Sequence, residues 1–123
     1  MYKRQDLDYL LIDMPPGTGD AYLTIFNELD VDHFILVTTE NRLAISDLKK
    51  TITMLAKLDI NILGYIRNNI LNIQDEFDDT FFKSNNILHL GTFLFDKKIY
   101  NFDLEYNSDI SNEISMIIDS KIR

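Results

Sequence analysis

Residues Leu7–Asp20 read LDYLLIDMPPGTGD, and this stretch decides the fold class. Its apolar part, Tyr9–Ile12, has no polar alternation, which is typical of a strand buried on both faces of a mainly parallel sheet. Asp13 follows at the carboxyl end of that predicted strand, where ligands bind in open α/β sheets. Proline and glycine residues then lead the chain into a loop. We therefore expect an α/β fold with a ligand-binding edge near Asp13.

Asp13 is the leading candidate for a functional residue. A carboxylate at the end of a buried strand can hold Mg²⁺, directly or through water, while the metal bridges the phosphates of a nucleotide. Gly17 and Gly19 supply positive φ or room for close approach to a phosphate, so the Gly17 backbone is a candidate γ-phosphate sensor. Thr18 and Asp20 are better suited to shaping the loop and capping a helix. The alternative is a structural strand followed by an ordinary turn.

Downstream, helical spacing alternates with continuous apolar runs, which predicts alternating helices and strands. This order, with short connections, predicts a partial doubly wound, mainly parallel sheet with helices on both faces. The acidic segment 75–79 lacks the ligand spacing and glycine of a calcium site, so we expect a solvated helix face. Its inward residues would be Phe77, Phe81 and Phe82. The other expected elements are a helix after Asp20, strands at 33–39, 61–66 and 87–95, and helices at 42–58 and 108–122.

The string Asp13–Asp20, DMPPGTGD, resembles the Walker B and switch II segment of the Mrp/ApbC family. These are iron–sulfur cluster carrier ATPases in the deviant P-loop class, which also contains the MinD, ParA and nitrogenase iron proteins. The resemblance implies that residues 6–123 are the carboxyl-terminal part of a P-loop NTPase-like domain. It also implies ATP and Mg²⁺ as cofactors, a homodimer, and iron–sulfur scaffold or client apoproteins as partners. The composition agrees with a cytoplasmic location. The resemblance continues through Ile35–Thr39, Ala44–Lys50 and Ile62–Asn68, and more weakly through Leu90–Asp96.

The same resemblance assigns roles to particular positions. Asp13 would be the Mg²⁺-associated carboxylate. Asn68 would pair with the adenine edge, although a turn-forming asparagine beside Asn69 is the alternative. Thr38 and Thr39, at the tip of the second predicted strand, would line the nucleotide pocket, unless they serve only as β-branched strand formers.

Three departures from the family pattern limit these roles. The sequence has no glycine-rich loop with a lysine near its start, so we expect no useful ATP affinity from this chain alone. It has no cysteine, whereas cluster-carrying relatives use a C-x-x-C pair soon after the position of Asn68, so we do not expect it to hold a cluster. His33 and His89 are isolated and are interpreted as structural. Glu40 and Leu94 replace family prolines, which changes the expected adenine-side contacts.

The first five residues, Met1–Gln5, match what a transposon-derived sequencing adapter encodes, and we expect them not to belong to the natural protein. On that interpretation, the chain from Asp6 onward is the carboxyl-terminal piece of a longer gene. The P-loop would then have been lost in sequence assembly and not in evolution. The alternative is a natural basic N-terminus on a short paralogue.

The composition argues against nucleic acid and membranes as partners of this chain. The formal net charge of −8 disfavours nonspecific nucleic-acid binding, which depends on Lys and Arg neutralising phosphates. No apolar run reaches about 18 residues, so we expect neither a membrane span nor secretion. Two alternatives to a carrier remain: a MinD- or ParA-like positioning ATPase, and a non-catalytic interaction module on the same fold.

Overall fold

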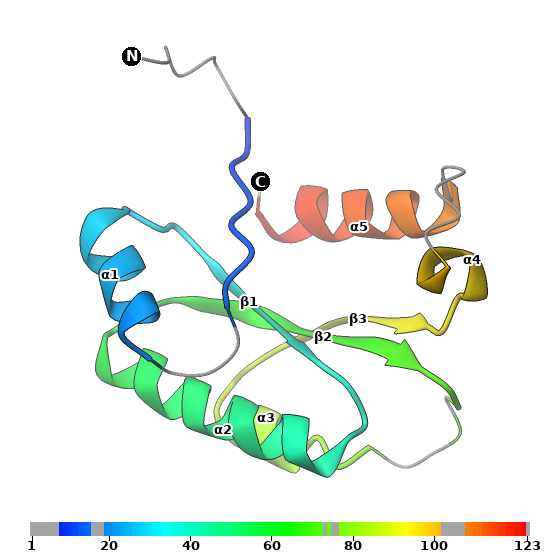
Figure 1. Cartoon of the computed structure of the whole chain (residues 1–123), viewed down its shortest axis with the longest axis horizontal. Helices are drawn as coiled ribbons and strands as arrows, with labels where there is room; N and C mark the ends of the chain where they lie inside the picture. Colours follow the sequence, from blue (N-terminus) through cyan, green and yellow to red (C-terminus); the bar gives the residue numbers. More distant parts are fainter. Residues whose placement is uncertain (1–7, 16–18, 73, 75–76, 102–107, 123) are drawn as a thin grey trace. The chain divides into compact units, whose positions relative to one another are not determined.

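A computed structural model of the chain describes residues 8–15, 19–72, 74, 77–101 and 108–122. The chain forms two compact units, Met1–Asp30 and Val31–Arg123. In the first unit, the described residues include the helix α1 (Asp20–Glu28) (Figure 1). The second unit contains β1 (Phe34–Thr38), α2 (Arg42–Lys57), β2 (Ile62–Ile70), α3 (Thr80–Ser84), β3 (His89–Leu94), α4 (Lys97–Tyr100) and α5 (Ser108–Lys121).

The second unit is built on one sheet of three parallel strands in the order β1-β2-β3. Thr38 of β1 lies opposite Arg67 of β2, and Ile66 of β2 lies opposite Gly91 of β3. The crossover helix α2 lies on one side of this sheet and α5 on the other (Figure 1). The predicted α/β fold, with a parallel sheet and helices on both faces, is therefore confirmed.

The longest helix, α2, follows its sequence signals closely. Asn41 is the N-cap, and its side-chain oxygen accepts a hydrogen bond from the backbone N–H of Leu43 at 2.8 Å. Ile52 and Leu55, three residues apart, are buried. Leu58 ends the helix as its C-cap. The helix expected at 42–58, with its apolar face inward, is confirmed.

An aromatic stack fills the core between β2 and α3. The rings of Tyr65 and Phe82 are stacked with centroids 4.1 Å apart, and Phe77 lies 5.9 Å from Phe82. The prediction of inward phenylalanines is therefore confirmed for Phe82, which is fully buried. The prediction of a helix over 75–79 is wrong for the described residues 77–79, because α3 begins only at Thr80.

Local hydrogen bonding accounts for that late helix start. Asp78 accepts a hydrogen bond from the backbone N–H of Thr80 at 3.1 Å, a turn that competes with helix. Lys83 forms an ion pair with Asp79 at 2.8 Å within the next turn. Asp75 and Glu76 lie outside the described residues.

Gly64 of β2 has no room for a side chain, because Leu88 and Leu90 lie close beside it. A Cβ atom there would lie 2.5 Å from the carbonyl oxygen of Leu88 and 2.6 Å from Cγ of Leu90. Gly64→Ala is therefore expected to lower the free energy of unfolding by about 1–3 kcal/mol, measured by urea denaturation. Gly91→Ala is the matched control, because its new Cβ would lie 3.1 Å from the flexible tip of Ile117 and 4.0 Å from Cε2 of Phe93. Equal losses in the two variants would contradict this account of the packing.

The buried strand expected at Tyr9–Ile12 is wrong. Residues 8–15 adopt no regular secondary structure, and Leu10 and Leu11 are 69% and 76% exposed. An apolar run becomes a strand only where a neighbouring strand supplies hydrogen-bond partners. Among the described residues, the three strands of the sheet pair only with one another.

The helix expected after the Pro/Gly loop is confirmed as α1, but its cap is not the expected one. Gly19 is the N-cap, and no side chain there accepts a capping hydrogen bond. Asp20 lies in the first turn instead, where its charge complements the positive end of the helix dipole. Within the helix, the rings of Tyr22 and Phe26 lie 6.2 Å apart, as their i, i+4 spacing predicts.

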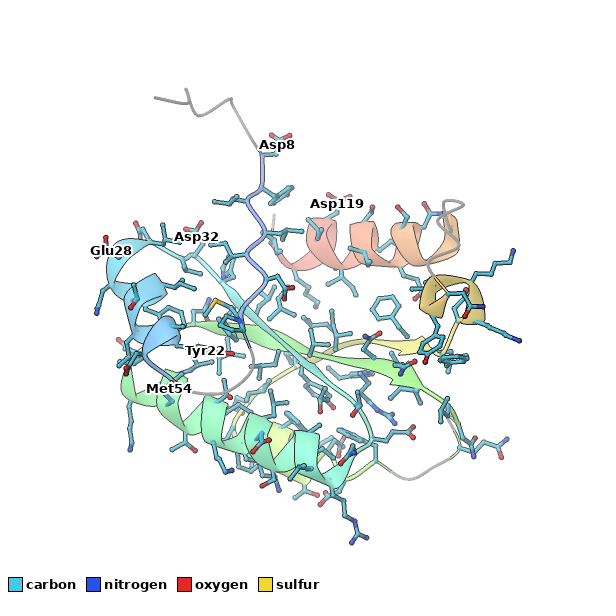
Figure 2. The ribbon with its side chains drawn as sticks, viewed as in Figure 1. Asp8, Tyr22, Glu28, Asp32, Met54 and Asp119 are labelled. Carbon is cyan, nitrogen blue, oxygen red and sulfur yellow. The ribbon has the colours of Figure 1, made fainter. Side chains whose placement is uncertain are left out.

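The carboxyl-terminal helix expected at 108–122 is confirmed as α5. It packs on β3, with Cδ1 of Ile117 close to the Gly91 backbone. Figure 2 shows Asp119 on the side of α5 that faces away from the sheet. Among the helices that the structure describes, none has the length and apolar character needed to cross a bilayer.

Candidate functional site

The candidate site lies where β1 and β2 end. The strands are parallel and Thr38 lies opposite Arg67, so their carboxyl ends meet at one edge of the sheet. Thr39 follows β1, and Asn68 lies near the end of β2. The fold thus brings the sequence-predicted residues Thr38, Thr39 and Asn68 to the same edge, which is the ligand-binding edge of open α/β sheets.

The two threonines use their hydroxyls in the turn from β1 into α2. Thr38 is buried, and its hydroxyl donates to the carbonyl oxygen of Thr39 at 3.2 Å. The Thr39 hydroxyl accepts a hydrogen bond from the backbone N–H of Asn41 at 3.3 Å. Their role in lining a nucleotide pocket stays a prediction.

Asn68 lies inside β2 and not beyond it, because the strand runs on to Ile70 instead of ending at residue 66 as expected. The pairing with β3 shifts register between Arg67 and Ile70. Asn69 lies within this irregularity with φ of 58°, a left-handed conformation that asparagine tolerates better than most residues. The side chain of Asn68 is exposed at the edge. Its predicted pairing with adenine stays a prediction.

Arg67 is the residue at this edge that sequence reasoning missed. Its Nη2 lies 3.4 Å from Oε1 of Glu40, and its guanidinium lies 4.3 Å from the centre of the Phe77 ring. The side chain is only 13% exposed. Its Nε is buried and has no hydrogen-bond partner among the described residues. No local spacing rule links residues so far apart in sequence, so only the fold reveals this contact.

Arg67 is also one of the charges that act on Tyr65, whose ring is buried. Burial raises the pKa of Tyr65 above its ordinary value of 10.0, and Asp79 raises it further, while Arg67 and Lys83 lower it. The tyrosine is neutral in the fold, so its stabilising contribution is complete below pH 10.0 and is lost as pH rises through the raised pKa.

Tyr65→Phe is therefore expected to reduce the fall in unfolding free energy between about pH 9 and pH 11. Urea denaturation at each pH measures this fall. Tyr100→Phe is the matched control, because Tyr100 is largely exposed. An unchanged alkaline slope in Tyr65→Phe would contradict the interpretation.

The predicted phosphate-side residues are in the other unit. Asp13 is exposed there, at the end of the irregular segment, and Gly17 lies outside the described residues. Within the described part of the chain, no group of three or more His, Asp or Glu side chains could hold a metal ion. Mg²⁺ at a nucleotide needs only one or two carboxylates besides phosphate and water, so a single Asp13 is compatible with it. The assigned roles of Asp13 and Gly17 stay predictions.

Both histidines have hydrogen-bond partners. Nδ1 of His33 lies 3.1 Å from the side-chain amide nitrogen of Asn61. Nε2 of His89 lies 2.9 Å from the hydroxyl oxygen of Thr92. The expectation that both rings find a partner within the fold is confirmed, and their purely structural role stays a prediction.

Parallel strands, helical crossovers and a polar carboxyl edge place the protein in the α/β class with a P-loop NTPase-like fold. The family model ParA, described as NUBPL iron-transfer P-loop NTPase, matches residues 2–91. The chain belongs to this family. This confirms the resemblance noted from the DMPPGTGD string.

Curated relatives agree with this assignment. The iron–sulfur cluster carrier protein of Methanocaldococcus jannaschii is 52% identical over 64 residues, covering 51% of this chain and 22% of the relative. That of Salmonella typhimurium is 44% identical over 68 residues, covering 55% and 18%. The cytosolic Fe-S cluster assembly factor Nubp2 homolog of Aedes aegypti is 43% identical over 67 residues, covering 52% and 26%. The matched region is thus about a fifth of the length of these relatives.

Proposed function

We propose that this chain is part of an ATP-binding iron–sulfur cluster carrier of the Mrp type. The observation that carries the proposal is the DMPPGTGD string at Asp13–Asp20, which lies inside the family match over residues 2–91. The names of the relatives support a carrier over a positioning ATPase. The formal net charge of −8 also argues against the nonspecific DNA binding that a partitioning ATPase would need.

The proposed chemistry is phosphoryl transfer from ATP to water. Bound Mg²⁺ would neutralise charge that develops on the transferred phosphate. Asp13 would hold that ion, and the Gly17 backbone N–H would donate to the γ-phosphate. Asn68, Thr38 and Thr39 would contact the nucleoside. The phosphate-binding loop and its lysine would come from sequence outside this chain.

The cluster would be cargo, and this chain does not provide its ligands. Thiolates are the usual ligands of iron–sulfur clusters, and the sequence has no cysteine. We therefore propose that any cluster ligands lie outside the 123 residues. We also propose that the full protein is a cytoplasmic homodimer that binds iron–sulfur scaffold or client apoproteins.

A chimera tests this function. The part of the Methanocaldococcus jannaschii carrier that precedes its matched region would be joined to residues 6–123 of this chain. We expect the chimera to hydrolyse ATP in the presence of Mg²⁺ and the 123-residue chain alone to show no hydrolysis. A chimera with native helical circular dichroism and no ATP binding would contradict the proposal.

A further inference from the structure

A cavity of about 580 Å³ lies in the second unit, beside the Arg67–Glu40 ion pair. It is bounded by the first turns of α2, the carboxyl ends of β1 and β2, and the segment before α3. Its volume falls within the range of small-molecule sites and exceeds what a single ion needs. The lining residues are Glu40, Arg42, Ile45, Ser46, Lys49, Arg67, Phe77 and Asp78.

Positively charged side chains line this cavity, although the chain as a whole is acidic. Among the lining residues that the structure describes, Arg42, Lys49 and Arg67 contribute three positive charges, against two from Glu40 and Asp78. The hydrogen bonds from Thr80, and to a lesser extent the charge of Lys49, lower the pKa of Asp78, which is therefore a carboxylate at neutral pH. Such local positive charge in a chain of net charge −8 favours an anionic ligand over a cationic one.

The orientation of Arg67 gives the cavity a specific binding group. Cζ of Arg67 lies 4.3 Å from the centre of the Phe77 ring, a cation–π contact that holds the guanidinium beside the cavity. Glu40 contacts Nη2 at 3.4 Å, near the upper limit for a hydrogen bond. The buried Nε has no partner among the described residues, although a buried N–H without a partner is costly. Because that atom is covered in this structure, the part of the guanidinium left for a ligand is its outer Nη edge.

We propose that this cavity binds a small organic oxyanion, either a phosphate monoester or a carboxylate. Arg67 would contact two ligand oxygens through its two Nη atoms, a fork geometry that arginine offers to both groups. Arg42 and Lys49 would add charge, and the Ser46 hydroxyl would donate a hydrogen bond. The proposal requires neither Asp13 nor ATP, so it stands or fails separately from the proposed carrier function.

Isothermal titration of the 123-residue chain at neutral pH tests this site. The probes are glucose 6-phosphate and succinate, with glucose as the uncharged control. We expect at least one anion to bind with a Kd below about 1 mM and glucose not to bind. Binding of glucose 6-phosphate alone would identify a phosphate site, and binding of succinate alone a carboxylate site.

Substitutions distinguish the paired hydrogen bonds of the Arg67 guanidinium from a general effect of positive charge. Arg67→Gln is expected to weaken binding by about tenfold or more, and Arg67→Lys by less, because lysine keeps the charge but loses the fork. Lys57→Gln is the matched control, since it removes the same charge in the last turn of α2, outside the cavity lining. Its affinity should stay within about twofold of the unaltered chain. Equal weakening by Arg67→Gln and Lys57→Gln, or no binding of either anion, would overturn the proposal.

Discussion

Replacing Phe82 with alanine is expected to lower the free energy of unfolding by about 3–5 kcal/mol. The ring is 0% exposed and stacks on Tyr65 with centroids 4.1 Å apart. Phe77 and Phe81 also contact it, so the substitution would leave a cavity bounded by aromatic rings that cannot all move inward. Urea denaturation followed by circular dichroism measures the loss.

Phe81→Ala is the matched control for this prediction. It removes the same side chain from the adjacent position of α3, but Phe81 is only partly buried and one face is covered by Lys49 at 5.0 Å. We expect a clearly smaller loss of stability than for Phe82→Ala. Equal losses would show that the aromatic stack is not the centre of the core.

The second large effect is expected at Asp13. In the chimera with an intact P-loop, Asp13→Asn should reduce MgATP hydrolysis by about 100-fold or more, because it would remove the negative charge that we propose holds Mg²⁺ at the transferring phosphate. The substitution is nearly isosteric and the residue is exposed, so the fold should persist. Phosphate release at saturating MgATP gives the rate.

Asp8→Asn provides the control for Asp13. Asp8 is also exposed and lies in the same irregular segment, outside the DMPPGTGD string. We expect its hydrolysis rate to match that of the unaltered chimera. A rate for Asp13→Asn equal to that of Asp8→Asn would remove Asp13 from the proposed mechanism.

Local signals explain why much of the second unit was predictable from sequence. The apolar face of α2 follows helical spacing, and its cap at Asn41 is a residue type that favours this position. β1 and β3 are short apolar runs that occur where they were expected. Short connections between them left a parallel sheet as the simplest arrangement.

The missing strand at Tyr9–Ile12, the longer β2 and the overlooked Arg67 contact share one physical cause, which is dependence on distant residues. Tyr9–Ile12 has the composition of a buried strand, but strand formation needs a hydrogen-bonded neighbour that no local pattern reveals. The extension of β2 past residue 66 depends on pairing with β3. The contact of Arg67 with Glu40 joins residues brought together by the β1–β2 crossover, so no motif encodes it.

The most direct measurement is a long sequencing read across the genomic locus upstream of the codon for Asp6. We expect an open frame that runs in phase into a glycine-rich K-G-G-x-G-K-[ST] loop, which would supply the phosphate-binding part of the proposed ATPase. A stop codon just upstream, with a genuine start at Met1, would contradict it. The chain would then be a natural short protein that does not hydrolyse ATP.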